Sequence, residues 1–207
     1  MNKIQLIEYL KNQGLSEGII KAFEKVDRKN FVPEEYHFEA YEDYPISIGH
    51  GATTSQPYTI AFMLEKLELK PNSKQKVLEI GSGSGYVLAL ISEITKGKVY
   101  GVEIIKELAK RSKETLKKLN FEDIAVINKS GFKGLHECAP YDRILVSAAC
   151  PNLETAKKLS NQLKEEGIIV ASVRHSIFQI KKHKRKITKI EEFPGFAFVP
   201  LVEEDKI

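Results

Sequence analysis

Glycine recurs at every second position in a short segment near the middle of the chain. The apolar run Val77–Ile80 predicts a buried strand that carries one carboxylate, Glu79. A loop at residues 81–85 follows, and the apolar residues 86–91 predict a helix behind it. Glycine allows positive φ angles and lets a ligand lie against bare backbone, while the first N–H groups of a helix attract an anion. The segment indicates either a loop that binds an anionic group or a purely structural tight turn.

A second carboxylate, Glu103, ends the next predicted strand, Val99–Glu103. In dinucleotide-binding proteins, an acidic residue about 20 positions after the glycine loop accepts hydrogen bonds from ribose hydroxyls. Glu79 is suited to accept a hydrogen bond from an ammonium group. S-adenosylmethionine combines a carboxylate, an ammonium group and a ribose, and we expect it to be the cofactor. The residues expected to bind it here are Glu79, Gly81, Ser82, Gly83, Gly85 and Glu103.

A nicotinamide enzyme is the main alternative, because such enzymes bind ribose in the same way. The dinucleotide fingerprint reads G-x-G-x-x-G, whereas the spacing here is G-x-G-x-G. The carboxylate before the first glycine also suits the ammonium of an amino acid better than a pyrophosphate. The pattern therefore favours a methyltransferase.

Strands alternate with helices through the rest of the chain. Further strands are predicted at residues 124–127, 141–146 and 167–171, and helices at residues 105–119 and 153–163. This alternation predicts an α/β fold with a mostly parallel central sheet and helices on both faces. The end of the chain lacks a helical pattern, and we expect two antiparallel strands there, at residues 177–181 and 196–201.

The first 44 residues predict an N-terminal helical addition to this sheet. Two amphipathic helices precede residue 27, and Pro33 ends the helical pattern. Pro57 suits the first turn of a further helix. The sequence contains neither an internal repeat nor a linker, so residues 1–207 are expected to form a single domain.

Composition points to a soluble cytoplasmic protein. The 207 residues are 42% hydrophobic and 29% charged, and the net charge of +4 without interleaved aromatic residues does not favour nucleic-acid binding. Cys138 and Cys150 form neither a disulfide framework nor a metal-ligand pattern, which fits a reducing compartment. The chain shows neither a secretory signal nor an apolar run of the ~20 residues that a membrane span needs. We therefore expect no metal and no membrane contact.

Several further segments carry specific motifs, at residues 28–33, 44–57, 77–86, 139–144, 148–149 and 198–201. Together they resemble the protein-L-isoaspartate O-methyltransferases, which repair isomerised aspartyl residues, over nearly the whole chain. The glycine loop occurs in many methyltransferases, whereas Thr-Thr-Ser-Gln-Pro at residues 53–57 is much more specific to this family.

The resemblance implies a Rossmann-like class I methyltransferase fold, with residues 57–207 as the cofactor-binding core and residues 1–56 as a helical and substrate-pocket region. It also implies methyl transfer from S-adenosylmethionine to the α-carboxylate of L-isoaspartyl residues in damaged proteins and peptides. The resulting ester starts repair through a succinimide. The resemblance favours a monomer.

The same resemblance implies residues for the substrate side of the site. Ser55 matches the family's active-site serine, and Thr53 and Thr54 line the pocket beside it. From the residues alone, Ser55 is also a good N-cap for the helix that Pro57 begins. His50, between two glycines, is expected near the substrate, either as a hydrogen-bonding loop residue or as an acid–base group.

Three segments depart from the family pattern. Ser130 and Gly131 stand where the family has an aspartate and a glycine beside the adenine, so Ser130 brings no charge. The segment Ser172-Val173-Arg174 replaces a Pro-Val-Gly that borders the family's substrate region. A basic run at residues 181–186 replaces a glycine turn, and it is interpreted as a solvated hairpin end or as an accessory site for acidic peptides or nucleic acid. Two alternative functions therefore stay open: a cofactor-binding member with altered or lost activity, and a methyltransferase for nucleic acid or small molecules.

Overall fold

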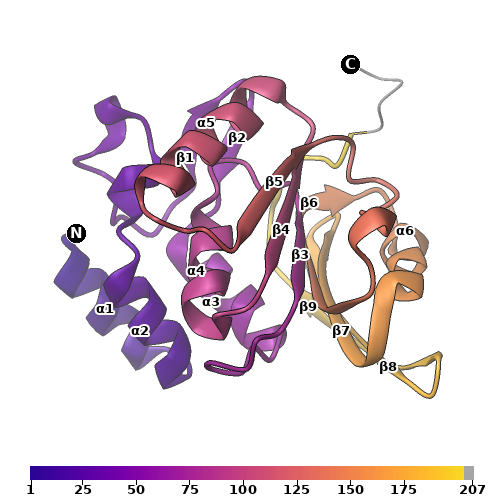
Figure 1. Cartoon of the computed structure of the whole chain (residues 1–207). Helices are drawn as coiled ribbons and strands as arrows, with labels where there is room; N and C mark the ends of the chain where they lie inside the picture. The colour runs from indigo at the N-terminus through magenta and orange to yellow at the C-terminus, as the bar shows by residue number, and fades with distance from the viewer. Residues whose placement is uncertain (203–207) are drawn as a thin grey trace.

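The computed structural model describes residues 1–202, and within them seven strands form one central sheet (Figure 1). These strands are β3 (Val77–Ile80), β4 (Val99–Glu103), β5 (Ile124–Asn128), β6 (Tyr141–Cys150), β7 (Leu163–Val173), β8 (Ser176–His183) and β9 (Lys186–Pro194). Their order across the sheet is β5-β4-β3-β6-β7-β8-β9. The strands from β5 to β7 pair in parallel, whereas β8 and β9 pair antiparallel at one edge. The predicted α/β fold with antiparallel C-terminal strands is confirmed.

Helices cover both faces of this sheet. They are α1 (Lys3–Asn12), α2 (Glu17–Lys25), α3 (Pro57–Lys66), α4 (Tyr86–Thr95), α5 (Lys106–Lys118) and α6 (Leu153–Lys158), with the short 3-10 helices η1 (Arg28–Phe31), η2 (Glu34–Tyr36), η3 (His136–Cys138) and η4 (Leu159–Gln162). Figure 1 shows α1 to α5 on one side of the sheet and α6 on the other. The α-helix predicted at residues 153–163 is shorter than expected: α6 ends at Lys158, and the chain continues as the tighter 3-10 helix η4.

Burial accounts for the central elements. All four residues of β3 are buried, as expected for a strand covered on both faces. Helix α4 is buried over most of its length and packs against α2 as well as the sheet. Helix α2 places Ile19, Ile20 and Phe23 in the same core. The N-terminal helices therefore share one hydrophobic core with α3 and α4.

A short hairpin precedes α3 and was not predicted. Strand β1 (Ile46–Gly49) pairs antiparallel with β2 (Ala52–Thr54), and Ile46 and Ile48 are buried on one side of it. Its turn holds His50 between two glycines, and all three residues have positive φ angles. Strands of four and three residues are too short to show a clear alternating pattern, so the sequence alone does not predict this hairpin.

The prediction of a strand at residues 196–201 is wrong. Strand β9 lies at Lys186–Pro194 instead, because the chain reverses at Lys184 and Arg185, which have φ angles of 48° and 64°. A two-residue turn with positive φ at both positions matches the twist of antiparallel strands, and here it forms without glycine. As an edge strand, β9 carries many exposed polar residues and shows little apolar pattern. Residues 199–201 run beside the end of β6, where the Ala149 N–H donates to Val199 O at 2.8 Å.

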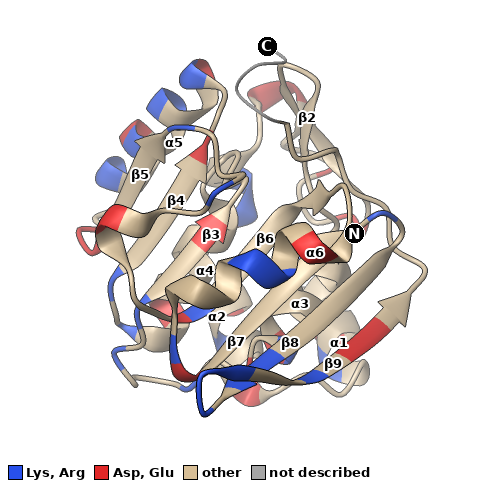
Figure 2. Cartoon of the chain, turned by 90° about the vertical axis from the view of Figure 1, so that its right-hand side faces the viewer, with Lys and Arg blue, Asp and Glu red and all other residues tan. Residues whose placement is uncertain are grey.

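The basic run at residues 181–186 lies at this last hairpin, which Figure 2 shows in blue at the turn between β8 and β9, at the opposite edge of the sheet from β5 and α5. Lys181 forms an ion pair with Glu68, and His183 contacts the Glu166 carboxylate. Lys182 Nζ donates to the carbonyl of Leu163 at 2.7 Å. These contacts within the chain favour the interpretation of the run as a structural hairpin end.

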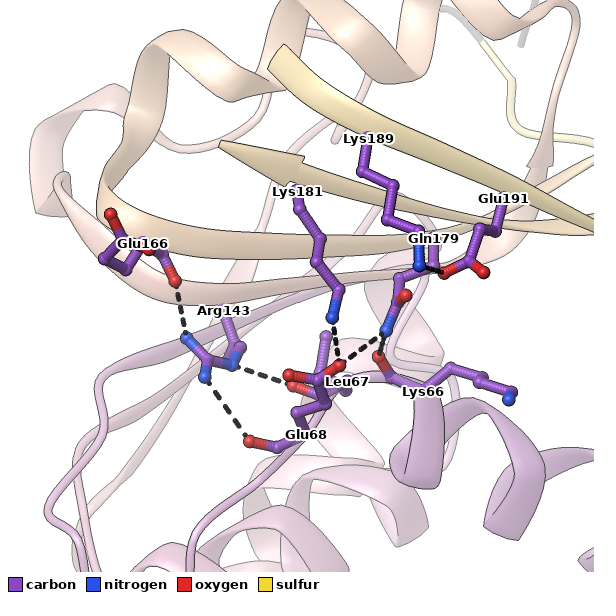
Figure 3. A network of polar contacts seen from close by, with 9 residues as sticks. All are labelled: Lys66, Leu67, Glu68, Arg143, Glu166, Gln179, Lys181, Lys189 and Glu191. Carbon is purple, nitrogen blue, oxygen red and sulfur yellow. Dashed lines mark hydrogen bonds and ion pairs between the residues drawn. The ribbon is translucent and has the colours of Figure 1, made fainter. Parts of the chain in front are cut away.

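Polar contacts also anchor the C-terminal end of α3 to the sheet (Figure 3). Arg143 in β6 donates from Nε to Leu67 O at 2.7 Å and from Nη2 to Glu68 O at 3.4 Å. Gln179 in β8 donates to the carbonyl of Lys66. The last carbonyls of a helix have no partners within the helix, so these donors stabilise its end.

Residues 1–202 show neither a membrane-spanning helix nor a metal-binding cluster. No helix in this range is long and apolar enough to span a bilayer. The same residues contain no cluster of three His, Cys, Asp or Glu side chains that could hold a metal ion.

Candidate active site

A cavity of about 250 Å³ lies at the carboxyl end of the parallel strands. The chain enters the sheet at β3, adds β4 and β5 on one side, and then crosses to β6 and β7 on the other. Ligands of open α/β sheets bind where the order of the strands reverses in this way. The cavity is lined by residues that directly follow β3 and β4 and by residues in the second half of β6, so its position fits this rule.

Most of the predicted site residues meet in the lining of this cavity. They are His50, Thr53, Thr54, Ser55, Glu79, Gly81, Ser82, Gly83, Glu103 and Gly131. Gly85 and Ser130 lie next to the lining without being part of it. The cavity therefore joins the predicted cofactor residues and the predicted substrate residues, which are separated in the sequence by α3.

The glycine loop leaves β3 through backbone angles that favour glycine. Gly81, Gly83 and Gly85 have φ angles of +79°, +49° and +85°. A Cβ atom at Gly81 would lie 3.0 Å from Ala148 Cβ, and one at Gly83 would lie 3.0 Å from Ile48 Cδ1. Both the backbone angle and the available space therefore require glycine, which explains the alternating pattern. Gly85 is the N-cap of α4, so its role is to let the helix start close to the loop.

Glu103 connects the glycine loop to the start of α5. Its Oε2 accepts from the Gly83 N–H at 2.8 Å, and its Oε1 accepts from the Ile105 N–H at 2.9 Å. Each carboxylate oxygen has further lone pairs, so the group can still accept hydrogen bonds from two hydroxyls in the cavity. Sequence reasoning anticipated a carboxylate that faces a ribose, but not that the same carboxylate orders the loop.

Glu79 is a buried carboxyl group that uses only part of its hydrogen-bonding capacity. It is 1% exposed, and its Oε1 accepts from Ser147 Oγ at 2.7 Å. Its Oε2 has no hydrogen-bond partner among the described residues. Burial raises the pKa of Glu79 to about 8; the Ser147 hydroxyl opposes this shift and the Glu103 charge adds to it. An ammonium group from a ligand would satisfy the free oxygen and favour the ionised form, so the residues present fit S-adenosylmethionine.

The raised pKa of Glu79 predicts a pH dependence of stability. Between about pH 4.5 and pH 8 the folded carboxyl keeps a proton that the unfolded chain has released. The free energy of unfolding should therefore fall with rising pH across this window, by at most about 1.4 kcal/mol per pH unit. Glu79→Gln removes the titrating group and should remove this component of the slope. Urea unfolding of both proteins at pH 5, 6.5 and 8 measures it, and parallel pH profiles would contradict the assignment.

The substrate side of the cavity comes from the β1–β2 hairpin and the segment after it. His50 lies exposed at the hairpin turn, Thr53 and Thr54 belong to β2, and Ser55 follows directly. The interpretation of Ser55 as the N-cap of α3 is wrong, because the N-cap is Gln56. The cap bond comes from a distant residue instead: Asp43 Oδ1 accepts from the Tyr58 N–H at 2.8 Å.

The segment after β5 borders the cavity through Gly131. A Cβ atom there would lie 2.4 Å from Ile80 Cγ2, so a side chain at this position would collide with the end of β3. Ser130 is nearly buried, and its hydroxyl accepts from the Phe132 N–H at 3.4 Å. Gly131 therefore lines the cavity, and Ser130 lies directly beside the lining.

Sequence reasoning missed two parts of the lining. Ser147 and Ala148 reach the cavity from the end of β6, and residues 199–202 close it from the C-terminal side. Both segments matched the family motifs at residues 148–149 and 198–201, but no local chemistry distinguished them. They meet because the Leu201 N–H donates to Ala149 O at 2.8 Å, which is a contact between distant parts of the chain.

The unusual segment at residues 172–174 lies outside the lining of the cavity. Ser172 is fully buried in β7, and its hydroxyl donates to Val146 O at 3.2 Å. Arg174 has a φ angle of 52° in the turn between β7 and β8. This departure from the family pattern is therefore accommodated by the sheet and its turn.

Comparison with known proteins agrees with this geometry. The chain matches the family model for protein-L-isoaspartate(D-aspartate) O-methyltransferase over residues 1–206. A protein-L-isoaspartate O-methyltransferase of Thermosipho melanesiensis is 39% identical over 202 residues, which cover 95% of this chain and 100% of that protein.

Two solved structures are also similar. One protein-L-isoaspartate O-methyltransferase superposes with a TM-score of 0.88 at 27% identity, and the match covers 98% of this chain and 66% of that one. A Plasmodium falciparum protein assigned to the same enzyme class, in complex with S-adenosyl-L-homocysteine, has a TM-score of 0.83 at 26% identity and covers 98% and 99% of the two chains. With the family model, the relative and the cavity in agreement, the chain belongs to the protein-L-isoaspartate(D-aspartate) O-methyltransferase family.

Proposed function

We propose that this chain transfers a methyl group from S-adenosylmethionine to the α-carboxylate of L-isoaspartyl residues in damaged proteins and peptides. The observation that carries the proposal is the composition of a single cavity. Its lining contains the glycine loop with Glu79 and Glu103, and also the family-specific segment that includes Ser55. A family name and an appropriate cavity thus lead to the same reaction.

The proposed reaction requires no proton transfer by the protein. Bound S-adenosylmethionine supplies an electrophilic methyl group on a positively charged sulfur. An acceptor carboxylate has a pKa of about 3 to 4 and is ionised at neutral pH, so no general base is needed. A lone pair of the acceptor oxygen forms the new bond to the methyl carbon, the electrons of the carbon–sulfur bond stay on sulfur, and no proton moves.

The residues of the chain contribute mainly alignment. A carboxylate and a sulfonium 4 Å apart attract by about 4 kcal/mol at an effective dielectric of 20, but this attraction weakens as both charges disappear in the transition state. We assign Ser55 to the acceptor carboxylate, with Thr53, Thr54 and His50 lining the surrounding pocket. Hydroxyl groups orient an oxygen without the strong binding of a full cation, which suits a reaction that depends on geometry.

For the cofactor, we assign the Glu79 carboxyl to the ammonium group and the first N–H groups of α4 to the methionine carboxylate, because the N–H groups of Gly81, Ser82 and Gly83 already donate within the chain. The glycine loop lets the ligand lie close to the backbone. Glu103 faces the ribose hydroxyls, and Ser130 with Gly131 lies toward the adenine. We further propose that residues 57–207 act as the cofactor-binding core of one domain, and that the protein works as a monomer in the cytoplasm. The free thiols of Cys138 and Cys150 are consistent with a reducing compartment.

Restoring a charge at Ser130 should strengthen cofactor binding. A carboxylate accepts a hydrogen bond from the adenine amino group with roughly 1 kcal/mol more than a neutral hydroxyl. The variant Ser130→Asp is therefore expected to lower the Kd for S-adenosylhomocysteine about fivefold. Calorimetric titration of both proteins measures the change. An unchanged or higher Kd would show that position 130 does not contact the adenine.

A methyl-transfer assay tests the proposed reaction. The protein is incubated with methyl-labelled S-adenosylmethionine and either an isoaspartyl peptide or RNA. The proposal predicts label on the peptide, released as methanol by mild base as expected for a methyl ester. Tight binding of S-adenosylhomocysteine without peptide labelling would favour a member with lost activity, and base-stable label on RNA would favour a nucleic-acid methyltransferase.

A further inference from the structure

Arg28 is a buried cation that the proposed reaction does not yet use. It lies in η1, is 1% exposed, and belongs to the largest fully buried side chains of the described residues. Its Nη1 donates to Ala40 O at 3.1 Å and to Glu42 O at 3.2 Å. Its Nη2 donates to Tyr44 O at 3.4 Å and to Ser55 O at 2.9 Å. One guanidinium group therefore connects two separate stretches of backbone, residues 40–44 and Ser55, to η1.

Burial of the Arg28 guanidinium costs free energy that other interactions must offset. Moving a charged group out of water costs several kcal/mol unless it is well paired, and burial lowers the pKa of Arg28 below its usual value. Among the described residues no carboxylate forms an ion pair with it, and its Nε has no acceptor. The compensation comes from backbone carbonyls, which only a rigid, planar fork of donors can reach together. This geometry favours a positioning role over a simple contribution to charge balance.

The carbonyl of Ser55 is the shortest of these contacts. Asp43, in the segment that Arg28 holds, accepts from the Tyr58 N–H at 2.8 Å. Arg28 and Asp43 thus fasten residues 40–44 to the segment that runs from Ser55 into the first turn of α3. Arg28 restrains the backbone of Ser55 through its carbonyl, and Ser55 also lines the cavity.

We propose that Arg28 is a positioning residue for the methyl-acceptor side of the site: it fixes the backbone of Ser55, so that the hydroxyl is aligned with the substrate carboxylate. The inference rests on the proposed function for its kinetic readout. None of the hydrogen bonds of Arg28 goes to the glycine loop, Glu79 or Glu103, so the effect of changing Arg28 should fall mainly on the acceptor side. A residue that acted only through stability would change both sides equally.

Arg143 offers a matched control. It is also a buried arginine, 7% exposed, and it also donates to backbone carbonyls, those of Leu67, Glu68, Asp142 and Glu166. It lies near the start of β6, at the end of the strand away from the cavity, where it anchors the C-terminal end of α3 (Figure 3). Arg28→Lys and Arg143→Lys therefore both replace a guanidinium that donates to several backbone carbonyls by a single ammonium. Only Arg28 holds a residue that lines the cavity.

Both variants are compared with the wild type at a temperature at which all three are folded. Arg28→Lys should lower kcat/KM for an isoaspartyl peptide about tenfold or more, while the Kd for S-adenosylhomocysteine changes less than twofold. Arg143→Lys should lower the Tm comparably and leave both constants within twofold of the wild type. An Arg28→Lys enzyme with wild-type peptide kinetics, or equal losses in both variants, would overturn the inference. Absence of activity in the wild type would instead refute the proposed function.

Hydrogen exchange gives a second measurement that needs no activity, and its wild-type part tests the inference even if the variant does not fold. In the wild type, Arg28 and Asp43 together hold residues 40–44 against the start of α3. The amides of residues 40–44 and the Tyr58 amide should therefore open together, with the same exchange protection to within a factor of three. In a folded Arg28→Lys protein these amides should lose protection, whereas those of β3 and β6 should not. Opening of the Tyr58 amide independently of residues 40–44 in the wild type would overturn the inference.

Discussion

Replacement of Ser55 by alanine is expected to lower kcat for methylation of an isoaspartyl peptide about 100-fold. The hydroxyl is small and lines the cavity, and its proposed task is to orient one oxygen of a carboxylate that is already reactive. A hydrogen bond to the carboxylate weakens as its charge disappears in the transition state, so the expected loss comes from alignment: a misplacement of about 1 Å can cost about 100-fold. Steady-state kinetics at saturating cofactor measures the change, and the Kd for S-adenosylhomocysteine should stay within about twofold.

A second serine of the same hairpin provides the control. Ser47 is exposed in β1, and its hydroxyl accepts only from the nearby Gly49 N–H at 3.3 Å. Ser47→Ala should therefore retain wild-type kcat. If Ser55→Ala retains full turnover, or if the two variants lose activity equally, Ser55 does not align the acceptor.

Glu103→Gln should weaken binding of S-adenosylhomocysteine about 100-fold, which corresponds to about 2.7 kcal/mol. The carboxylate accepts from the backbone N–H groups of Gly83 and Ile105, and it is assigned to the ribose hydroxyls. A glutamine side chain has one oxygen and one NH₂ group, so one of these N–H donors would face another donor. Hydrogen bonds to charged groups contribute about 1.5 to 3 kcal/mol each, so the loss of one or two accounts for the expected size.

Glu107→Gln is the matched control for this variant. Glu107 lies exposed in the first turn of α5, four residues from Glu103, so its replacement changes the net charge equally without reaching the cavity. Its Kd should stay within about twofold of the wild type. Calorimetric titration of the wild type and both variants with S-adenosylhomocysteine measures the three Kd values. A Kd for Glu103→Gln within threefold of the wild type would refute the assignment of Glu103 to the ribose.

Local patterns were sufficient to predict the strands and the glycine loop on one side of the cavity. The strands Val77–Ile80 and Val99–Glu103 have the predicted bounds, because buried parallel strands are short, continuous apolar runs. The loop was identifiable because its positive φ angles favour glycine, which leaves an alternating pattern in the sequence. What local patterns did not show was the second contact of Glu103, since its bond to Gly83 joins residues twenty positions apart.

The acceptor half depended more on the resemblance and on tertiary contacts. Ser55 alone predicted a helix cap, yet that cap bond is accepted by Asp43, which lies twelve positions earlier. Residues 199–202 reach the cavity beside β6, although the sequence pattern placed a hairpin strand there. Edge strand β9 escaped prediction because exposed, charged strands lack an apolar period. Interactions between distant segments therefore decide this side of the cavity.

The ratio of kcat/KM for an isoaspartyl peptide to that for its aspartyl twin tests the account most directly. The two peptides have the same composition and charge, and they differ only in which carboxyl group of the aspartate forms the peptide bond. If the cavity aligns the α-carboxylate of an isoaspartyl residue, the ratio should be about 100 or more, with one base-labile methyl group per isoaspartyl residue. Equal rates for the two peptides, or no ester on either despite tight binding of S-adenosylhomocysteine, would contradict it.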